Sequence, residues 1–222
     1  MFECQYCGAQ FKSERTIMVH VCEPKRRWMN KDEKYSRLAF YAYGRFYELT
    51  QAVGNKSFED FVKSKFYLGF SKFGMHIINI NAINPEDFVD FVIRNSVKLD
   101  RWCSDSVYET YIQELNRKES ADRAVERSIL LMQKWGAEYD RPFNRFFKEV
   151  SKPLAIHYIT SGRLSPWAIF NCDSGAELID SFSDRELIII NGYLEPHFWT
   201  RKFNARVEDV QFVKMILKKA GI

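Results

Sequence analysis

Apolar residues recur at helical spacing along most of the chain beyond residue 30. The segment 31–53 is predicted to be a helix because its apolar side chains fall near that spacing, at Leu38, Tyr41, Phe46, Leu49 and Val53. Ser57, with Asp60 three residues later, resembles a capping box and predicts the start of the next helix. One face of that helix carries an apolar stripe, which we expect to be core: Phe58, Phe61, Val62, Phe66, Phe70, Phe73 and Ile77.

Several later segments also carry helix signals. Asn84, followed by Pro85 and two acidic residues, is typical of a helix start. The other predicted helices cover 104–117, 120–136, a short stretch from Pro142, 153–161, 173–182, 184–191 and 207–220. The short apolar runs 167–170 and 187–190 fit either a strand or a helix. With no internal repeat, the pattern predicts a mainly α protein with roughly eight or nine helices in a multi-helix globular domain.

The first 22 residues follow a different pattern, in which metal-ligating residues replace the helical stripe. Cys4-x2-Cys7 predicts a two-strand turn with both thiols on one side, and 13–21 should form a helix that presents His20. Apolar Phe11 and Ile17 would fill the space between them. Soft thiolates with an imidazole suit Zn²⁺, so we expect a ββα unit that holds zinc through Cys4, Cys7, His20 and Cys22.

Residues 1–22 resemble the zinc fingers that use two cysteines and two histidines. The match holds through His20, but the family places its fourth ligand three to five residues later, and here Cys22 follows after two. Side chains two residues apart in a helix do not share a face. The helix must therefore end at His20 if Cys22 is to reach the metal. A water molecule or His76 as fourth ligand, and a hairpin without metal, stay open.

The finger is followed by a proline, three consecutive basic residues and an aromatic residue. We divide the chain into a zinc finger (1–23), a basic linker (24–30) and a helical domain (31–222). Cations beside a stacking aromatic suit a phosphate backbone, and the start of a finger helix can enter a DNA groove. The candidate nucleic-acid contacts are Lys12, Arg15, Lys25, Arg26, Arg27 and Trp28.

Other interpretations of these residues stay open. A lone finger buries little surface on DNA, and finger helices can equally dock on proteins. The linker could simply be solvated, with Trp28 packed on the helical domain. The formal net charge of +4, from 33 basic and 29 acidic residues, leans only weakly toward polyanions.

Little in the sequence indicates catalysis. It has no phosphate-binding loop, dinucleotide fingerprint or His-Glu-x-x-His motif. Cys103 lies between Asp100 and Asp105, but no histidine stands near in sequence to activate it. We therefore expect a protein that is not an enzyme. Three of the five cysteines fall in the first 22 residues, which favours a reduced compartment, and no signal peptide or membrane span is expected.

A second resemblance extends over the whole chain. Its elements are Cys22-Glu23-x-Lys25-Arg26-Arg27, the stretch 46–51, Ala82-Ile83-Asn84-Pro85, the stretch 102–108 and Ser165-Pro166-Trp167. Together they resemble uncharacterised zinc-finger proteins of large contractile-tailed bacteriophages. The resemblance implies a phage protein that works in the host bacterial cytoplasm or is carried in a particle, and it implies no catalytic residues.

These observations lead to two functional hypotheses. The first is a zinc-binding accessory protein that contacts DNA and docks on a transcription, replication or packaging partner. The alternative is a structural or protein–protein interaction protein, of the virion or of host takeover, whose finger docks on protein. The oligomeric state is not predicted.

Overall fold

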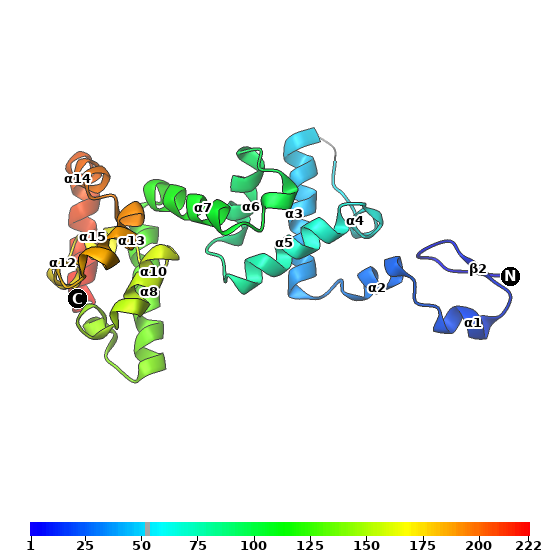
Figure 1. Cartoon of the computed structure of the whole chain (residues 1–222), viewed down its shortest axis with the longest axis horizontal. Helices are drawn as coiled ribbons and strands as arrows, with labels where there is room; N and C mark the ends of the chain where they lie inside the picture. The colour runs from blue at the N-terminus through cyan, green and yellow to red at the C-terminus, as the bar shows by residue number, and fades with distance from the viewer. Residues whose placement is uncertain (52–53) are drawn as a thin grey trace. The chain divides into compact units, whose positions relative to one another are not determined.

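The computed structural model of the chain describes residues 1–51 and 54–222 (Figure 1). Within them the protein is mainly α and 72% helical, as the sequence predicts. The described residues form fifteen α-helices, more than the eight or nine expected, because several predicted or unassigned segments form separate short helices. The first elements are β1 (Phe2–Glu3), β2 (Gln10–Phe11), α1 (Glu14–Val19), α2 (Glu23–Met29), α3 (Lys34–Gln51), α4 (Phe58–Lys63), α5 (Tyr67–Asn79), α6 (Pro85–Arg94) and η1 (Leu99–Arg101). Those that follow are α7 (Asp105–Lys118), α8 (Ala121–Tyr139), η2 (Phe143–Arg145), α9 (Phe146–Glu149), α10 (Lys152–Thr160), α11 (Pro166–Ile169), α12 (Asp173–Asp180), α13 (Asp184–Leu194), α14 (Pro196–Ala205) and α15 (Val207–Lys219).

The chain divides into two compact units, Met1–Val107 and Tyr108–Ile222, which we call unit 1 and unit 2. Their boundary falls inside α7, within the range 31–222 that we expected to be one helical domain. The expected limits of finger, linker and helical domain stay a prediction. The segment 24–30 nevertheless has a regular structure that the word linker does not describe, because Glu23–Met29 form helix α2.

Unit 1 is built on an aromatic core around the paired helices α3 and α5 (Figure 1). Gly74 brings the two helices together: a Cβ atom there would lie 2.3 Å from the backbone oxygen of Tyr35. Trp102 is fully buried beside Phe70 and Phe73, with ring centroids 5.5 and 4.9 Å away, and its Nε1 donates to the Val97 carbonyl at 2.8 Å. Edge-on aromatic contacts of this kind add to the gain from burial.

The predicted Phe-rich helix is wrong in one respect, because it is two helices. Ser57 starts α4 with a complete capping box, but the helix ends at Lys63 and α5 begins at Tyr67. Ser64 is extended between them, and its Oγ accepts the Phe66 amide at 3.1 Å. Phe66 is consequently 40% exposed, whereas the rest of the stripe is buried.

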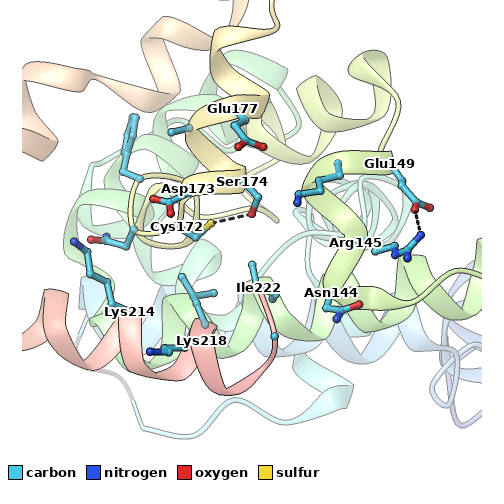
Figure 2. A pocket seen from close by; sticks show the side chains of 16 residues that line it. Asn144, Arg145, Glu149, Cys172, Asp173, Ser174, Glu177, Lys214, Lys218 and Ile222 are labelled. Carbon is cyan, nitrogen blue, oxygen red and sulfur yellow. Dashed lines mark hydrogen bonds and ion pairs between the residues drawn. The ribbon is translucent and has the colours of Figure 1, made fainter.

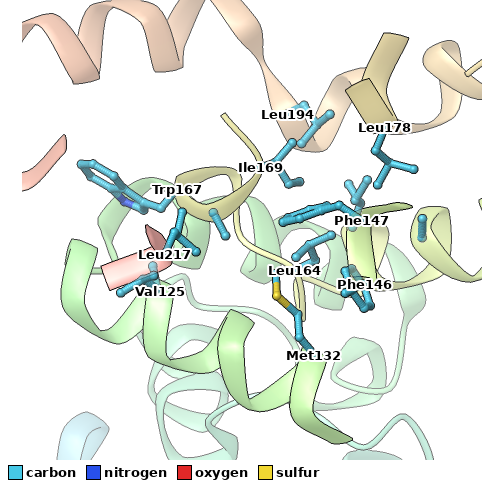
Figure 3. Packing of buried hydrophobic residues seen from close by; sticks show 14 of the residues in the cluster. Val125, Met132, Phe146, Phe147, Leu164, Trp167, Ile169, Leu178, Leu194 and Leu217 are labelled. Carbon is cyan, nitrogen blue, oxygen red and sulfur yellow. The ribbon is translucent and has the colours of Figure 1, made fainter. Parts of the chain in front are cut away.

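In unit 2, α8 packs against α9, α11 and α15, and Figure 3 shows part of the buried hydrophobic cluster of this unit. Val125 and Met132 on α8 meet Trp167 of α11 and Leu217 of α15 in one buried cluster. Ser128 connects α8 to the start of α11 through hydrogen bonds. Its Oγ donates to the Ala124 carbonyl and accepts a hydrogen bond from the amide of buried Ser165. Burial of these apolar side chains favours folding of this unit.

The short apolar runs are helical, and one further helix of the structure was not predicted. Residues 166–169 form α11 and 187–190 lie inside α13, which begins with a capping box at Ser183. The sequence analysis did not anticipate α14. The helix predicted over 31–53 is described from Lys34 to Gln51, and 52–53 lie outside the described residues. None of the helices in the described ranges has the length and apolar character needed to cross a membrane.

Candidate metal centre

A tight turn between two short strands positions the first two cysteines. β1 and β2 are antiparallel, with Phe2 opposite Phe11. Inside the turn the Cys4 amide donates to the Ala9 carbonyl at 2.9 Å, and the Gly8 amide donates to the Cys4 carbonyl at 2.8 Å. Gly8 has φ of +72°, a conformation that glycine adopts without strain. The turn therefore brings the Cys4 and Cys7 sulfurs to one side, as the spacing predicts.

The third and fourth side chains come from the end of α1 and the start of α2. Ser13 caps α1 by accepting the Thr16 amide at 3.3 Å. The helix ends at Val19, and His20 is already extended, with φ of −71° and ψ of 121°. Cys22 is the residue that precedes α2. The early helix end that the two-residue spacing required is thus present.

The four ligand atoms of Cys4, Cys7, His20 and Cys22 all lie within 4.8 Å of one another. The Cys4 and Cys22 sulfurs are 3.9 Å apart, and the Cys7 sulfur is 3.3 Å from His20 Nε2. Tetrahedral zinc, with bonds of about 2.3 Å to sulfur and about 2.0 Å to nitrogen, places such pairs about 3.8 and 3.5 Å apart. The cluster therefore fits a tetrahedral ion such as Zn²⁺. His76 lies on α5 and is not part of it.

The pKa values of the two thiols of the turn shift in opposite directions. Burial disfavours the Cys4 thiolate. Hydrogen bonds from the amides of Tyr6 and Cys7, together with those from the thiols of Cys7 and Cys22, outweigh burial and lower the pKa of Cys4. At Cys7 an amide hydrogen bond from Ala9 favours the thiolate. Burial and the neighbouring thiols of Cys4 and Cys22 outweigh that bond, so the pKa of Cys7 is raised. Gathering several thiolates without a cation is unfavourable, and a bound divalent ion removes that repulsion.

The finger has almost no apolar core of its own. Phe11 and Ile17, the expected filling, are both half-buried, and α1 has no buried residue. The Phe11 ring lies 4.7 Å from the His20 ring, centroid to centroid, and so steadies the imidazole. With so little burial, the ordering entropy of this segment requires the energy of metal binding.

Most of the basic residues after the finger contact the protein itself. Lys25 Nζ donates to the His20 carbonyl at 3.0 Å. Arg27 donates to the Val62 carbonyl at 2.9 Å, and its guanidinium lies 4.5 Å from the centre of the Tyr67 ring. Arg26 pairs with Glu23 at 3.3 Å and stays 65% exposed. Two of the three cations of α2 are thus engaged within unit 1, Lys25 with the finger and Arg27 with α4.

Trp28, the expected stacking residue, is half-buried between the finger and α4. Its ring lies 5.5 Å from Phe58 and 6.1 Å from Tyr6, centroid to centroid. This is the packing role that the sequence left open as an alternative. Lys12 and Arg15, by contrast, lie exposed at the start of α1. Three of the six candidate nucleic-acid contacts, Lys12, Arg15 and Arg26, are exposed. The other three, Lys25, Arg27 and Trp28, are half-buried and contact the protein.

The sequence analysis overlooked two residues of this region. Gly8 permits the turn at the cysteines, and its place directly after Cys7 was the available signal. Tyr6 joins the turn to Trp28, and no local pattern could indicate so distant a contact. In comparisons with known proteins, no family model, curated protein or solved structure matches this chain.

Proposed function

We propose that residues 1–22 form a structural zinc finger and that the protein acts by binding a macromolecular partner, not by catalysis. The observation that supports this proposal is that the protein supplies the complete set of four ligands. Three thiols and one imidazole occupy all the positions of a tetrahedral ion, whereas catalytic zinc keeps one position for water or substrate. The ion would therefore hold the Cys4–Cys7 turn against α1, and the surface that it orders is the functional part.

The surface of the finger favours a protein as that partner. Met18 and Val19 are 73% and 74% exposed, and Val21 is also exposed. Residues 1–22 carry two basic and two acidic side chains, and three thiolates with one Zn²⁺ add a net negative charge. Exposed apolar side chains on a module without net positive charge suit protein docking better than contact with a phosphate backbone.

DNA contact is the second candidate, and the exposed Lys12, Arg15 and Arg26 support it. The phage setting and the host cytoplasm come from the whole-chain resemblance alone and stay predictions. In that setting the partner would be a component of transcription, replication or packaging, or of the virion.

The metal is tested by its stoichiometry. We expect one zinc per chain by elemental analysis, and loss of that zinc in Cys7→Ser and in Cys22→Ser. Cys103→Ser and Cys172→Ser are matched controls outside the cluster and should keep the ion. Full zinc retention in Cys22→Ser would show that the fourth ligand is not Cys22.

The partner class is tested by site-specific photocrosslinking in bacterial cells. A crosslinker at Met18 should capture a protein, and Cys22→Ser should abolish capture. A crosslinker at Leu130, equally apolar and 57% exposed on α8, is the control. Equal capture from both positions would contradict docking through the finger. DNA contact instead predicts a salt-dependent mobility shift that Arg15→Ala weakens and exposed Arg185→Ala does not.

A further inference from the structure

Unit 2 contains a cavity of about 1000 Å³, remote in sequence from the finger. It lies among the start of α12, the end of α15 and the segment η2–α9 (Figure 2). Cavities of this size accommodate small organic ligands. The lining is rich in charged side chains, so its electrostatics indicate which ligand would fit.

Three ammonium groups line this cavity, those of Lys148, Lys214 and Lys218. In residues 1–51 and 54–222 none of the three forms an ion pair or side-chain hydrogen bond. Arg145 differs, because it donates to the Glu149 carboxylate at 3.2 Å (Figure 2). All three lysine side chains are exposed at the mouth of the cavity, and none has a partner among the described residues that an anion would have to displace. A bound anion would gain from their charge.

The start of α12 offers carboxylates to the same space. Asp173 and Glu177 line the cavity, and within the described chain neither carboxylate is paired. Figure 2 shows Lys214 and Lys218 on α15 at the lower left, Asp173 and Ser174 above them, and the Arg145–Glu149 pair at the other side. Free carboxylates disfavour a bare polyanion but accept hydrogen bonds from hydroxyl groups. The ligand should therefore be anionic at one end and hydroxylated at the other.

The remaining lining favours binding without covalent chemistry. Burial raises the pKa of the Cys172 thiol, and its Sγ donates to the Ala168 carbonyl at 3.4 Å. Ser174 in turn donates its hydroxyl to that sulfur at 3.7 Å. A neutral, hydrogen-bonded thiol is a poor nucleophile. Phe170 and Leu217 add an apolar surface for the organic part of a ligand.

We propose that this cavity binds a phosphate monoester with hydroxyl groups, such as a sugar phosphate. The lysines of α15, together with Lys148, hold the phosphate, and Asp173 and Glu177 accept hydrogen bonds from the hydroxyl groups. The inference rests on unit 2 alone and does not depend on the zinc finger.

Calorimetric titration of the full, zinc-loaded chain with ribose 5-phosphate at low salt tests the phosphate end. Lys214→Gln combined with Lys218→Gln should weaken binding by about tenfold or more, since charged hydrogen bonds are lost. Lys219→Gln removes the same charge from the same helix outside the cavity and should bind as the wild type does. No binding by the wild type, or equal weakening in Lys219→Gln, would overturn the proposal.

A second variant tests the hydroxyl end. Asp173→Asn removes a negative charge, so inorganic phosphate should bind more tightly than to the wild type. The preference for ribose 5-phosphate over inorganic phosphate should fall at the same time, because a hydroxyl acceptor is weakened. If the preference does not fall, the assignment of the hydroxyl end is wrong. Circular dichroism establishes that each variant is folded.

Discussion

At the scale of single residues, His76 shows how burial changes the pKa of a side chain. It lies half-buried on α5, and its Nε2 atom is buried with no hydrogen-bond partner in the described part of the chain. Burial lowers the pKa of His76, and the Asp105 carboxylate opposes this only in part. The folded protein therefore binds a proton at this position less readily than the unfolded chain does.

This lowered pKa predicts a pH dependence of stability. The contribution of neutral His76 is fully present above about pH 6.5, the unfolded value, and is lost as the pH falls through the folded pKa. We expect His76→Gln to reduce the fall in unfolding midpoint between pH 7.5 and pH 5. Urea unfolding followed by fluorescence measures it. An identical fall in the variant and the wild type would contradict this assignment.

The finger shows what single residues reveal from sequence alone. The spacing of Cys4, Cys7 and His20 predicts their grouping because a turn and one short helix bring them together. The closeness of Cys22 to His20 even predicts that the helix ends early, since side chains two apart cannot share a helix face. Such arguments need only local geometry, and for that reason they hold.

At the scale of elements, the crossing of α3 and α5 depends on a missing side chain. An added Cβ at Gly74 would meet the Tyr35 carbonyl oxygen at 2.3 Å and the Ala39 nitrogen at 3.1 Å. These are backbone atoms of the neighbouring helix, so neither can move without shifting α3. Gly44 lies in α3 itself, and an added Cβ there would meet nothing within 4 Å.

Replacement by alanine should therefore have opposite effects on stability at Gly74 and at Gly44. Gly74→Ala should destabilise the protein by about 1–3 kcal/mol through overpacking. Gly44→Ala should stabilise it by about 1 kcal/mol, because alanine favours the helix. Thermal or urea unfolding of both variants beside the wild type measures the two changes. A neutral or stabilising Gly74→Ala would show that the helices do not approach as closely as described.

The break between α4 and α5 marks the limit of element-level prediction. The apolar stripe continues through Phe66 without interruption, so periodicity predicts one long helix. The chain instead leaves the helix at Ser64, and Phe61 and Tyr67 pack against each other with ring centroids 4.8 Å apart. Packing across the break outweighs local periodicity, and no local pattern shows it.

At the scale of the whole molecule, the metal and the two helical cores are separate sources of stability. The ligand cluster belongs to residues 1–22, and the core of unit 2 contains none of its residues. The helices of both units, not the finger, make up most of the helical content, since α1 has six residues. The finger should therefore unfold alone when the ion is removed.

Metal removal tests this separation. A strong chelator should abolish amide hydrogen-exchange protection in residues 1–22 while the peptides of α5, α8 and α15 keep theirs. Far-ultraviolet circular dichroism should fall only slightly. Added zinc should restore the protection, and Cys7→Ser with zinc should behave like the chelated wild type. Loss of protection throughout unit 1 would show that the metal also holds the helical core.

The sequence by itself determined the helices with clear caps and the four-residue metal cluster, because capping, helical period and ligand spacing act over a few residues. Only the tertiary structure decided that Arg27 and Trp28 face the protein, that the chain forms two units and that residues of α9, α12 and α15 line one cavity. These features depend on which distant surfaces pack together. The free-energy difference between alternative packings is small and is summed over many long-range contacts, so no short stretch of sequence determines it.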